Sequence, residues 1–419
     1  MYAVGTEECI TLKLMVLKEE SKVIFAEAGK DFVDVLFSFL TLPLGTIARF
    51  VRKESKLQPS EVASFSSLYQ SVENLDKECF PTDTCKEMLL CPRNSMEAYC
   101  KSLKINIDDT EPTVDFVRNN LVRCRNQPAS TFRNKRCICG SMLAEPISTE
   151  ASEFFDGFVK SNSCFMITDD LKVFPISLDK IVNMVKDGGI KNMSSISEMT
   201  VNMTKNQVVD MLKCCLCSRT VLTDLFFGKL NCERLLKSTG IAPSDLKSNN
   251  CNGIIVKILF RKSNGIILFT EGKADFADFL FSFLTIPLGG ALCLMGGCSY
   301  VDSVDGLYKS VVDLDEDYCT TKELKNKFID PVLAPQYEFY CTTAKRMLVN
   351  SPSSERPAAS KGKVVNDPFL ESFVALEFLD PLSDTCNVTM AVRILQASLS
   401  SRSALTLGLS HLTKGKEDN

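Results

Sequence analysis

Residues 31–45 read DFVDVLFSFLTLPLG, and residues 275–289 repeat them as DFADFLFSFLTIPLG. The two segments differ only at positions 33, 35 and 42 and at their counterparts. Such close repetition indicates that the chain contains two copies of one structural unit, so any prediction of the fold starts from that unit.

The repeated segment has the pattern of a buried helix. Phe32, Leu36 and Phe39 follow helical spacing, and further apolar residues widen their stripe nearly all the way round. Asp31 stands where the free amides and the dipole of a helix N-terminus favour an acid. Pro43 cannot continue the helix, and we expect a second helix over about residues 46–52.

The repeat extends toward the N-terminus without a gap, so that residues 13–45 correspond to residues 257–289. Residues 10–28 have the apolar-rich, partly alternating pattern of a β-hairpin. In the second copy, Asn264-Gly265 is a strong hairpin-turn signal. Each copy is therefore predicted to open with two strands and a buried helix.

Later blocks of the chain recur as well. Residues 67–76 return as residues 306–315, and residues 209–226 return as residues 392–409. Residues 158–175 are predicted to form two strands, and they have no visible counterpart in the second copy. The sequence leaves open whether the core of the second copy is incomplete or is completed by strands of the first.

These patterns predict an α+β fold with two tandem divergent repeats, each a β-hairpin-headed sheet packed with helices. The first repeat covers residues 1–240 and contains a cysteine-bearing insert at about residues 120–145. The second repeat is shortened and covers residues 250–415, and residues 416–419 form a tail.

The composition is that of a soluble globular chain, with 45% apolar and 24% charged residues among 419. A net charge of −4 predicts no general attraction to nucleic acid. The first residues lack the pattern of a secretory signal, so we expect a cytoplasmic or nuclear protein whose 19 cysteines are reduced. Cys214, Cys215 and Cys217 are then expected in the core. The single histidine, His411, argues against histidine-based catalytic sites.

Residues 276–298 carry one charge, Asp278, and are long enough to span a membrane. Their counterpart in the first copy is interrupted by Pro43, Arg49 and Arg52. Because homologous copies should share a fold, we predict that both segments belong to a soluble core, and membrane insertion is the minor alternative.

Cys124, Cys137 and Cys139 form the most suggestive cysteine cluster. The order Cys-Ile-Cys-Gly at residues 137–140 resembles half of a zinc knuckle. A structural zinc site needs four ligands, and only Cys91 or Cys100 would complete this set, through long-range folding. We favour ordinary thiols on a loop, with a degenerate ribbon-like zinc site as the alternative.

Six acids recur near the start of the repeated helix. Paired carboxylates at this spacing serve as general acid and base or bind a hard cation. We favour the alternative that the aspartates are first-turn acids facing the surface and that the glutamates make turn contacts. The six are Asp31, Asp34, Asp275, Asp278, Glu27 and Glu271.

Three other polar positions can each be interpreted as structural or as part of a binding site. Asp169-Asp170 is predicted to form the turn between two strands. Ser218-Arg219 is expected to begin a helix with the serine as its cap, and an anion site there is the alternative. Lys30 follows Gly29, but the remaining residues of a phosphate-binding loop are lacking.

Tyr69 and Tyr308 occupy equivalent positions of a short predicted helix. A repeated aromatic residue at helical spacing usually belongs to a core, and the alternative is an anchor for a binding partner. We favour the core.

Several blocks, in order, resemble the plant family catalogued as domain of unknown function 674. They are KLMVLKEESKVIFAEAGKDFVDVLFSFLTLPLGTIARF, SLYQSVENLD, CKEMLLCPRNSMEAYC, RCICG, FMITDDLKVFPIS and LTDLFF. The resemblance covers most of the chain and includes the tandem duplication. It implies a plant protein of a multi-copy family, and it supplies no activity, cofactor or catalytic residue to carry over.

We therefore expect a non-catalytic protein-interaction or scaffold protein with an unidentified protein partner. Two similar units suit bivalent binding or self-association. The alternative is an enzyme or small-ligand-binding protein with a site between the repeats, built from acids or cysteines. No catalytic residue and no cofactor is predicted, apart from the zinc alternative.

The zinc alternative has a direct test. If Cys137 and Cys139 are ordinary thiols, metal analysis of the purified protein should find no zinc, and the double variant Cys137→Ser/Cys139→Ser should fold like the wild type. One zinc per chain that is lost in this double variant would instead establish a structural metal site.

Overall fold

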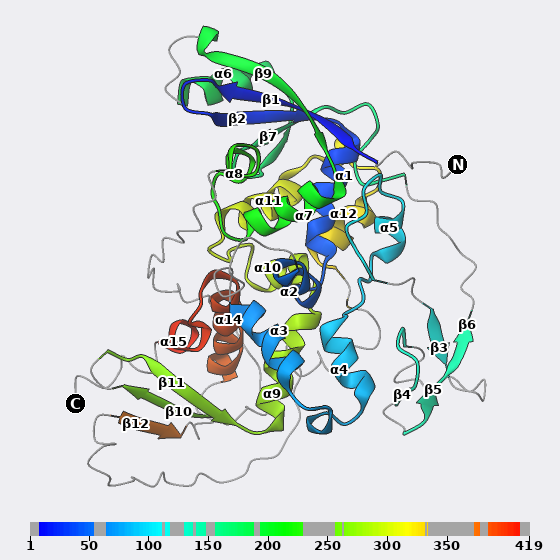
Figure 1. Ribbon diagram of the computed structural model, residues 1–419, viewed down its shortest axis with the longest axis vertical. Helices are drawn as coiled ribbons and strands as arrows, with labels where there is room; N and C mark the ends of the chain where they lie inside the picture. The colour runs from blue at the N-terminus through cyan, green and yellow to red at the C-terminus, as the bar shows by residue number, and fades with distance from the viewer. Residues whose placement is uncertain are drawn as a thin grey trace.

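The computed structural model describes residues 8–53, 64–110, 114–117, 130–136, 140–147, 156–187, 193–228, 256–261, 264–331, 333, 373–377 and 384–410. Within these ranges helices and antiparallel sheets occur together, which confirms the predicted α+β class. Two sheets lie at opposite ends of the molecule, and helices fill the space between them (Figure 1).

The larger sheet has the strand order β8-β7-β2-β1-β9 and is antiparallel throughout. Alternate residues of β1, such as Leu12 and Leu14, are fully buried, as the partial alternation of the sequence predicts. The strands are β1 (Ile10–Leu17), β2 (Lys22–Ala28), β7 (Phe165–Thr168), β8 (Val173–Pro175) and β9 (Ile196–Met203).

The smaller sheet has the order β11-β10-β12. Its strands β10 (Val256–Arg261) and β11 (Ile267–Gly272) correspond to β1 and β2, and β12 (Phe373–Glu377) pairs with β10 as β9 pairs with β1. Within the described part of the chain, no strand of this sheet corresponds to β7 or β8. The sequence likewise shows the β7–β8 hairpin in the first copy without a visible counterpart in the second.

The helices after each hairpin follow the same order in both halves of the chain. Each long repeated helix ends in a 3₁₀ turn, and a proline then starts the next helix, as the sequence indicates. In the first half these are α1 (Lys30–Ser38), η1 (Phe39–Thr41), α2 (Leu44–Arg52), α3 (Ser64–Asn74) and α4 (Asp83–Leu90). In the second half they are α9 (Ala274–Ser282), η5 (Phe283–Thr285), α10 (Leu288–Leu294), α11 (Asp302–Asp313) and α12 (Lys322–Ile329).

The remaining elements close the two halves. Two small two-stranded sheets stand apart from the helices (Figure 1). They comprise β3 (Asp115–Val117) with β6 (Glu145–Ile147), and β4 (Lys135–Arg136) with β5 (Met142–Leu143). The other helices are α5 (Glu97–Lys101), α6 (Leu178–Asp187), α7 (Lys205–Cys215), α8 (Val221–Phe227), α14 (Asp384–Ser400) and α15 (Ala404–Gly408), besides the short 3₁₀ turns η3 (Lys77–Cys79), η4 (Met193–Ser195) and η6 (Glu316–Tyr318).

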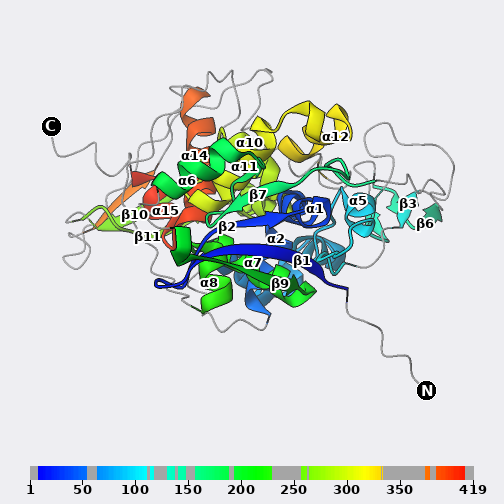
Figure 2. The same cartoon turned by 90° about the horizontal axis from the view of Figure 1, so that it is seen from above.

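The two halves meet where the proline of each repeated segment starts a helix. The backbone N–H of Leu44 donates to the carbonyl of Ile286 at 2.9 Å, and that of Leu288 donates to Leu42 at 2.9 Å. These four residues form two equivalent pairs in the repeat, so the contact is reciprocal. Helix α2 consequently packs against η5 of the second half, and α10 packs against η1 of the first. This junction lies in the central helical region of the molecule (Figures 1 and 2).

Helices also pack across the boundary between the halves. The backbone N–H of Ser64, at the start of α3, donates to the carbonyl of Ser401 at 2.9 Å. The equivalent residue at the start of α11, Ser303, donates its hydroxyl to the carbonyl of Ser218 at 2.7 Å. Each of these helices therefore contacts the closing segment of the other half. The limits 1–240 and 250–415 stay a prediction from the sequence.

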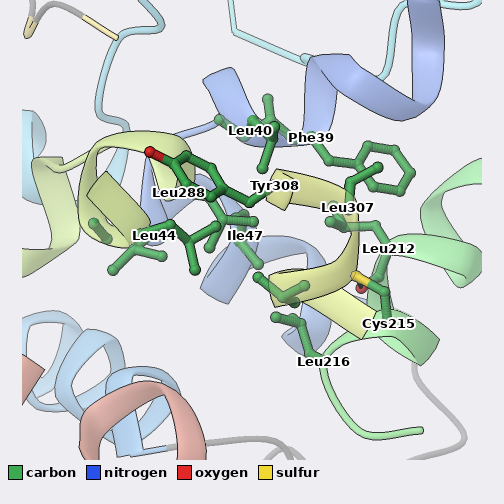
Figure 3. Packing of buried hydrophobic residues seen from close by; sticks show 14 of the residues in the cluster. Phe39, Leu40, Leu44, Ile47, Leu212, Cys215, Leu216, Leu288, Leu307 and Tyr308 are labelled. Carbon is green, nitrogen blue, oxygen red and sulfur yellow. Dashed lines mark hydrogen bonds between the residues drawn. The ribbon is translucent and has the colours of Figure 1, made fainter. Parts of the chain in front are cut away.

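One continuous core results from this packing. Figure 3 shows Leu44 and Ile47 of α2 beside Leu288 of α10, with Leu307 of α11 and Leu212 of α7 close by. All five side chains are fully buried. The core thus draws on both copies of the repeat.

Among the residues that the structure describes, no helix combines the length and the apolar character needed to cross a membrane. The apolar stretch at residues 276–298 is divided between α9, η5 and α10, and Pro287 breaks it at the N-cap of α10.

The close approach of the halves predicts a contrast between two neighbouring glycines. A Cβ at Gly289 would lie 2.6 Å from the carbonyl oxygen of Phe328 and 3.1 Å from that of Leu40. A Cβ at Gly290 would meet nothing closer than 3.7 Å. Gly289→Ala should therefore lower the free energy of unfolding by about 1–3 kcal/mol in denaturant titrations. The control Gly290→Ala should be neutral or raise it by about 0.5–1 kcal/mol. Equal effects of the two variants would contradict this packing.

Candidate functional site

Asp34 of α1 is the most deeply buried acid of the repeat, with 3% of its surface exposed. One of its carboxylate oxygens accepts the backbone N–H groups of Phe158 at 2.8 Å and Val159 at 3.0 Å. The ammonium of Lys30 lies 3.3 Å from the other oxygen. Burial raises the pKa of Asp34, although the hydrogen bonds and Lys30 act to lower it. The expectation that this acid faces the surface is wrong, because residues 156–159 fold over it.

The other repeated acids have simpler surroundings. Asp31 is half exposed and pairs with Lys104 at 3.4 Å. Asp278, the counterpart of Asp34, is exposed, as predicted. Glu27 and Glu271 lie within β2 and β11 and not in a turn, so the predicted turn contact is wrong. Within the described residues, no three histidine, cysteine or acidic side chains gather as a metal site would require.

Residues 156–175, here called the covering segment, pack over the first copy of the repeated helix. The ring of Phe158 meets Phe37 edge to face at 5.2 Å and Phe328 of α12 at 4.9 Å. The N–H of Lys160 donates to the carbonyl of Tyr318, and the N–H of Thr320 donates to that of Phe158. The covering segment therefore joins α1 of the first half to α12 of the second.

The covering segment ends in the β7–β8 hairpin, with Asp169 and Asp170 at its turn as predicted. Asp169 has a further role that the sequence analysis missed. Its carboxylate accepts the N–H of Thr223 at 2.8 Å and the hydroxyl of the same residue at 2.7 Å. That hydroxyl accepts the N–H of Val23. Burial raises the pKa of Asp169, although the hydrogen bonds from Thr223 act to lower it. Through these hydrogen bonds the carboxylate orders the start of α8.

A signal for this contact was present in the repeat. Thr223 and Thr406 are equivalent, and Thr406 accepts the N–H of Ile267 just as Thr223 accepts that of Val23. An identical threonine in both closing segments could have indicated that it contacts the second strand of each hairpin.

Ser218 does not cap a helix, contrary to the prediction. Helix α8 begins at Val221 with Thr220 at its N-cap. The hydroxyl of Ser218 donates instead to the carboxylate of Asp224. Arg219 pairs with Asp302 at 2.5 Å, so this predicted anion position is occupied by an acid of the second half.

Tyr69 and Tyr308 are core residues, as predicted, with 6% and 7% of their surfaces exposed. Their hydroxyls donate to the carbonyls of Leu90 at 3.1 Å and Ile329 at 3.2 Å, which are equivalent positions. Burial raises the pKa of Tyr69 to about 12, so this hydroxyl stays protonated at neutral pH.

Cys124, Cys137 and Cys139 lie outside the described residues. The two cysteines considered as additional zinc ligands have other contacts: Cys100 lies 3.5 Å from the hydroxyl of Thr41, and Cys91 accepts from Arg49 at 3.3 Å. Burial raises the pKa of Cys100 to about 12, which keeps it a thiol. Three further cysteines are buried, as predicted, namely Cys214, Cys215 and Cys217.

Comparison with known proteins gives one match. The model of the family described as "Protein of unknown function (DUF674)" matches residues 6–397. No curated protein and no solved structure matches the chain.

The contrast between Asp34 and Asp278 generates a prediction. Asp34→Ala leaves two backbone N–H groups without their acceptor and removes one partner of Lys30, which also contacts Asp156. It should therefore lower the free energy of unfolding by about 3 kcal/mol. Asp278→Ala removes the equivalent acid, which is exposed, and should change the free energy of unfolding by less than about 0.5 kcal/mol. Thermal and denaturant unfolding of both variants would measure the difference. Equal losses would mean that the covering segment does not depend on Asp34.

Proposed function

Because the chain belongs to the DUF674 family, whose description names no activity, we propose from its geometry that it is a non-catalytic protein-interaction or scaffold protein. The observation that carries the proposal is the apolar packing at the junction of the two halves. Leu44, Ile47 and Leu288 are each fully buried there and fill the region between the copies (Figure 3). A protein whose two copies share one core in this way can present its outer surfaces to protein partners.

The reactive groups near this junction support the same proposal through their contacts. Asp34 and Asp169 accept backbone N–H groups and hold the covering segment and α8 in place. The thiol of Cys100 is kept protonated by burial. Each of these groups thus has a role in the fold, whereas a general acid or base needs access to its substrate.

The cysteines support a cytoplasmic or nuclear location as part of the proposal. Cys79, Cys164 and Cys298 are exposed free thiols. Exposed free thiols suit a compartment that keeps cysteines reduced.

Affinity purification of the intact protein from its source tissue would test the proposal, with bound proteins and small molecules both identified. The matched variant is Asp31→Asn/Asp275→Asn, which removes exposed acids and leaves both the buried Asp34 and Asp278 in place. We expect one reproducible protein partner with both forms. A small molecule retained by the wild type alone, without a protein partner, would favour an enzyme or ligand-binding protein instead.

A further inference from the structure

The two copies of the repeat differ most in the chain segments that pack over their helix and along the edge of their hairpin. In the first copy, the covering segment lies over α1 and along the edge of β2, where β7 pairs with residues 25–28. In the second copy, the corresponding edge of β11 has no strand beside it among the described residues. The first copy therefore serves as a template: it shows which strand and which side chains cover a complete unit.

As a result, residues that are identical in the two copies differ in their exposure to solvent. Phe25 of β2 is 5% exposed, whereas its counterpart Phe269 of β11 is 56% exposed. Phe37 of α1 is fully buried, whereas Phe281 of α9 is half-buried. Asp34 is buried and Asp278 is exposed. An exposed aromatic side chain on an unpaired strand edge is a liability that proteins usually cover.

These positions form one surface, here called the open surface, which comprises Phe269, Asp278, Phe281 and the loop at residues 79–81. Helix α9 follows β11 directly, and Phe80 of the loop lies 6.3 Å from Phe281. In the first copy the equivalent positions are those that contact the covering segment: β2, Asp34, Phe37 and residues 318–320.

We propose that the open surface binds an extended segment of a partner protein that resembles the covering segment. This inference rests on the proposed interaction function and names its surface and the chemistry of its partner. A strand of the partner pairs antiparallel with β11, as β7 pairs with β2. Two successive backbone N–H groups ahead of that strand donate to Asp278, as those of Phe158 and Val159 donate to Asp34.

The template also defines the side chains that the partner strand needs. Phe165 and Ile167 of β7 are fully buried and pair with Ala28 and Ala26, on the core side of the sheet. Their counterparts on β11 are Gly272 and Thr270. The partner strand therefore carries apolar side chains at alternate positions, preceded by an aromatic residue in the place of Phe158.

Two features limit the correspondence. Pro81 stands where Thr320 stands in the other half, and a proline has no N–H to donate, so one of the two backbone bonds around Phe158 cannot recur. The covering segment of a second copy of this chain is already held by its own Asp34. The favoured occupant is thus a different protein.

The test uses the intact chain and a labelled peptide of residues 156–176 with Cys164→Ser as the probe. We expect saturable binding by fluorescence anisotropy, with slowed hydrogen exchange at the amides of residues 266–272. Asp278→Ala and Phe269→Asp should each weaken binding about tenfold. Leu178→Asp places the same charge at an exposed position of α6, 80% exposed, and should leave binding unchanged.

Three results would overturn the proposal. The peptide does not bind, or it binds equally to all variants, or the β11 amides that face away from β10 are already protected in the protein alone. If the β11 amides are already protected, either a second copy of the chain or the chain's own residues cover this edge. Measuring the mass of the native protein on dilution distinguishes the two, because a dimer dissociates and a monomer does not. Failure of the peptide together with a partner captured by affinity purification would refute the open surface and leave the interaction function standing.

Discussion

The reciprocal pair of backbone hydrogen bonds at Pro43 and Pro287 is the constraint on which the rest of this fold depends. Because each proline begins a helix, the chain is extended just before it and exposes backbone groups. Leu44 and Leu288 satisfy those groups in the opposite copy. This contact brings α2 against η5 and α10 against η1. Gly289 lies at this junction, and a Cβ there would meet backbone carbonyl oxygens from both halves.

Once the centre is joined in this way, the helices on either side pack across the boundary. Helix α3 contacts the closing segment of the second half, and α11 contacts that of the first. The covering segment adds a third connection, from Asp34 to the carbonyl and amide groups before α12. The copies therefore support one another, although their surroundings are unequal.

The sequence anticipated much of this arrangement. The repeated hairpin, the buried helix and its end at Pro43 were readable because apolar spacing and proline act locally. The two copies can be compared directly, so the sequence showed no visible counterpart of the β7–β8 hairpin, and among the described residues the smaller sheet has no such strands. The burial of Asp34 was not readable, since its acceptor role depends on Phe158 and Val159, more than a hundred residues away. Ser218 was assigned as a helix cap because the helix was expected to begin there, whereas α8 begins three residues later and the Ser218 hydroxyl donates to Asp224.

The sequence by itself determined the α+β class, the two copies and the residues that line each helix and strand, because these follow from local periodicity and from the repeat. Only the tertiary structure decided which identical residues are buried. Phe25 and Phe269 have the same side chain and the same place in their strands, yet one is covered and the other is exposed. The reason is that burial depends on neighbours from distant parts of the chain: the covering segment lies beside β2, and no strand lies at the equivalent edge of β11 among the described residues.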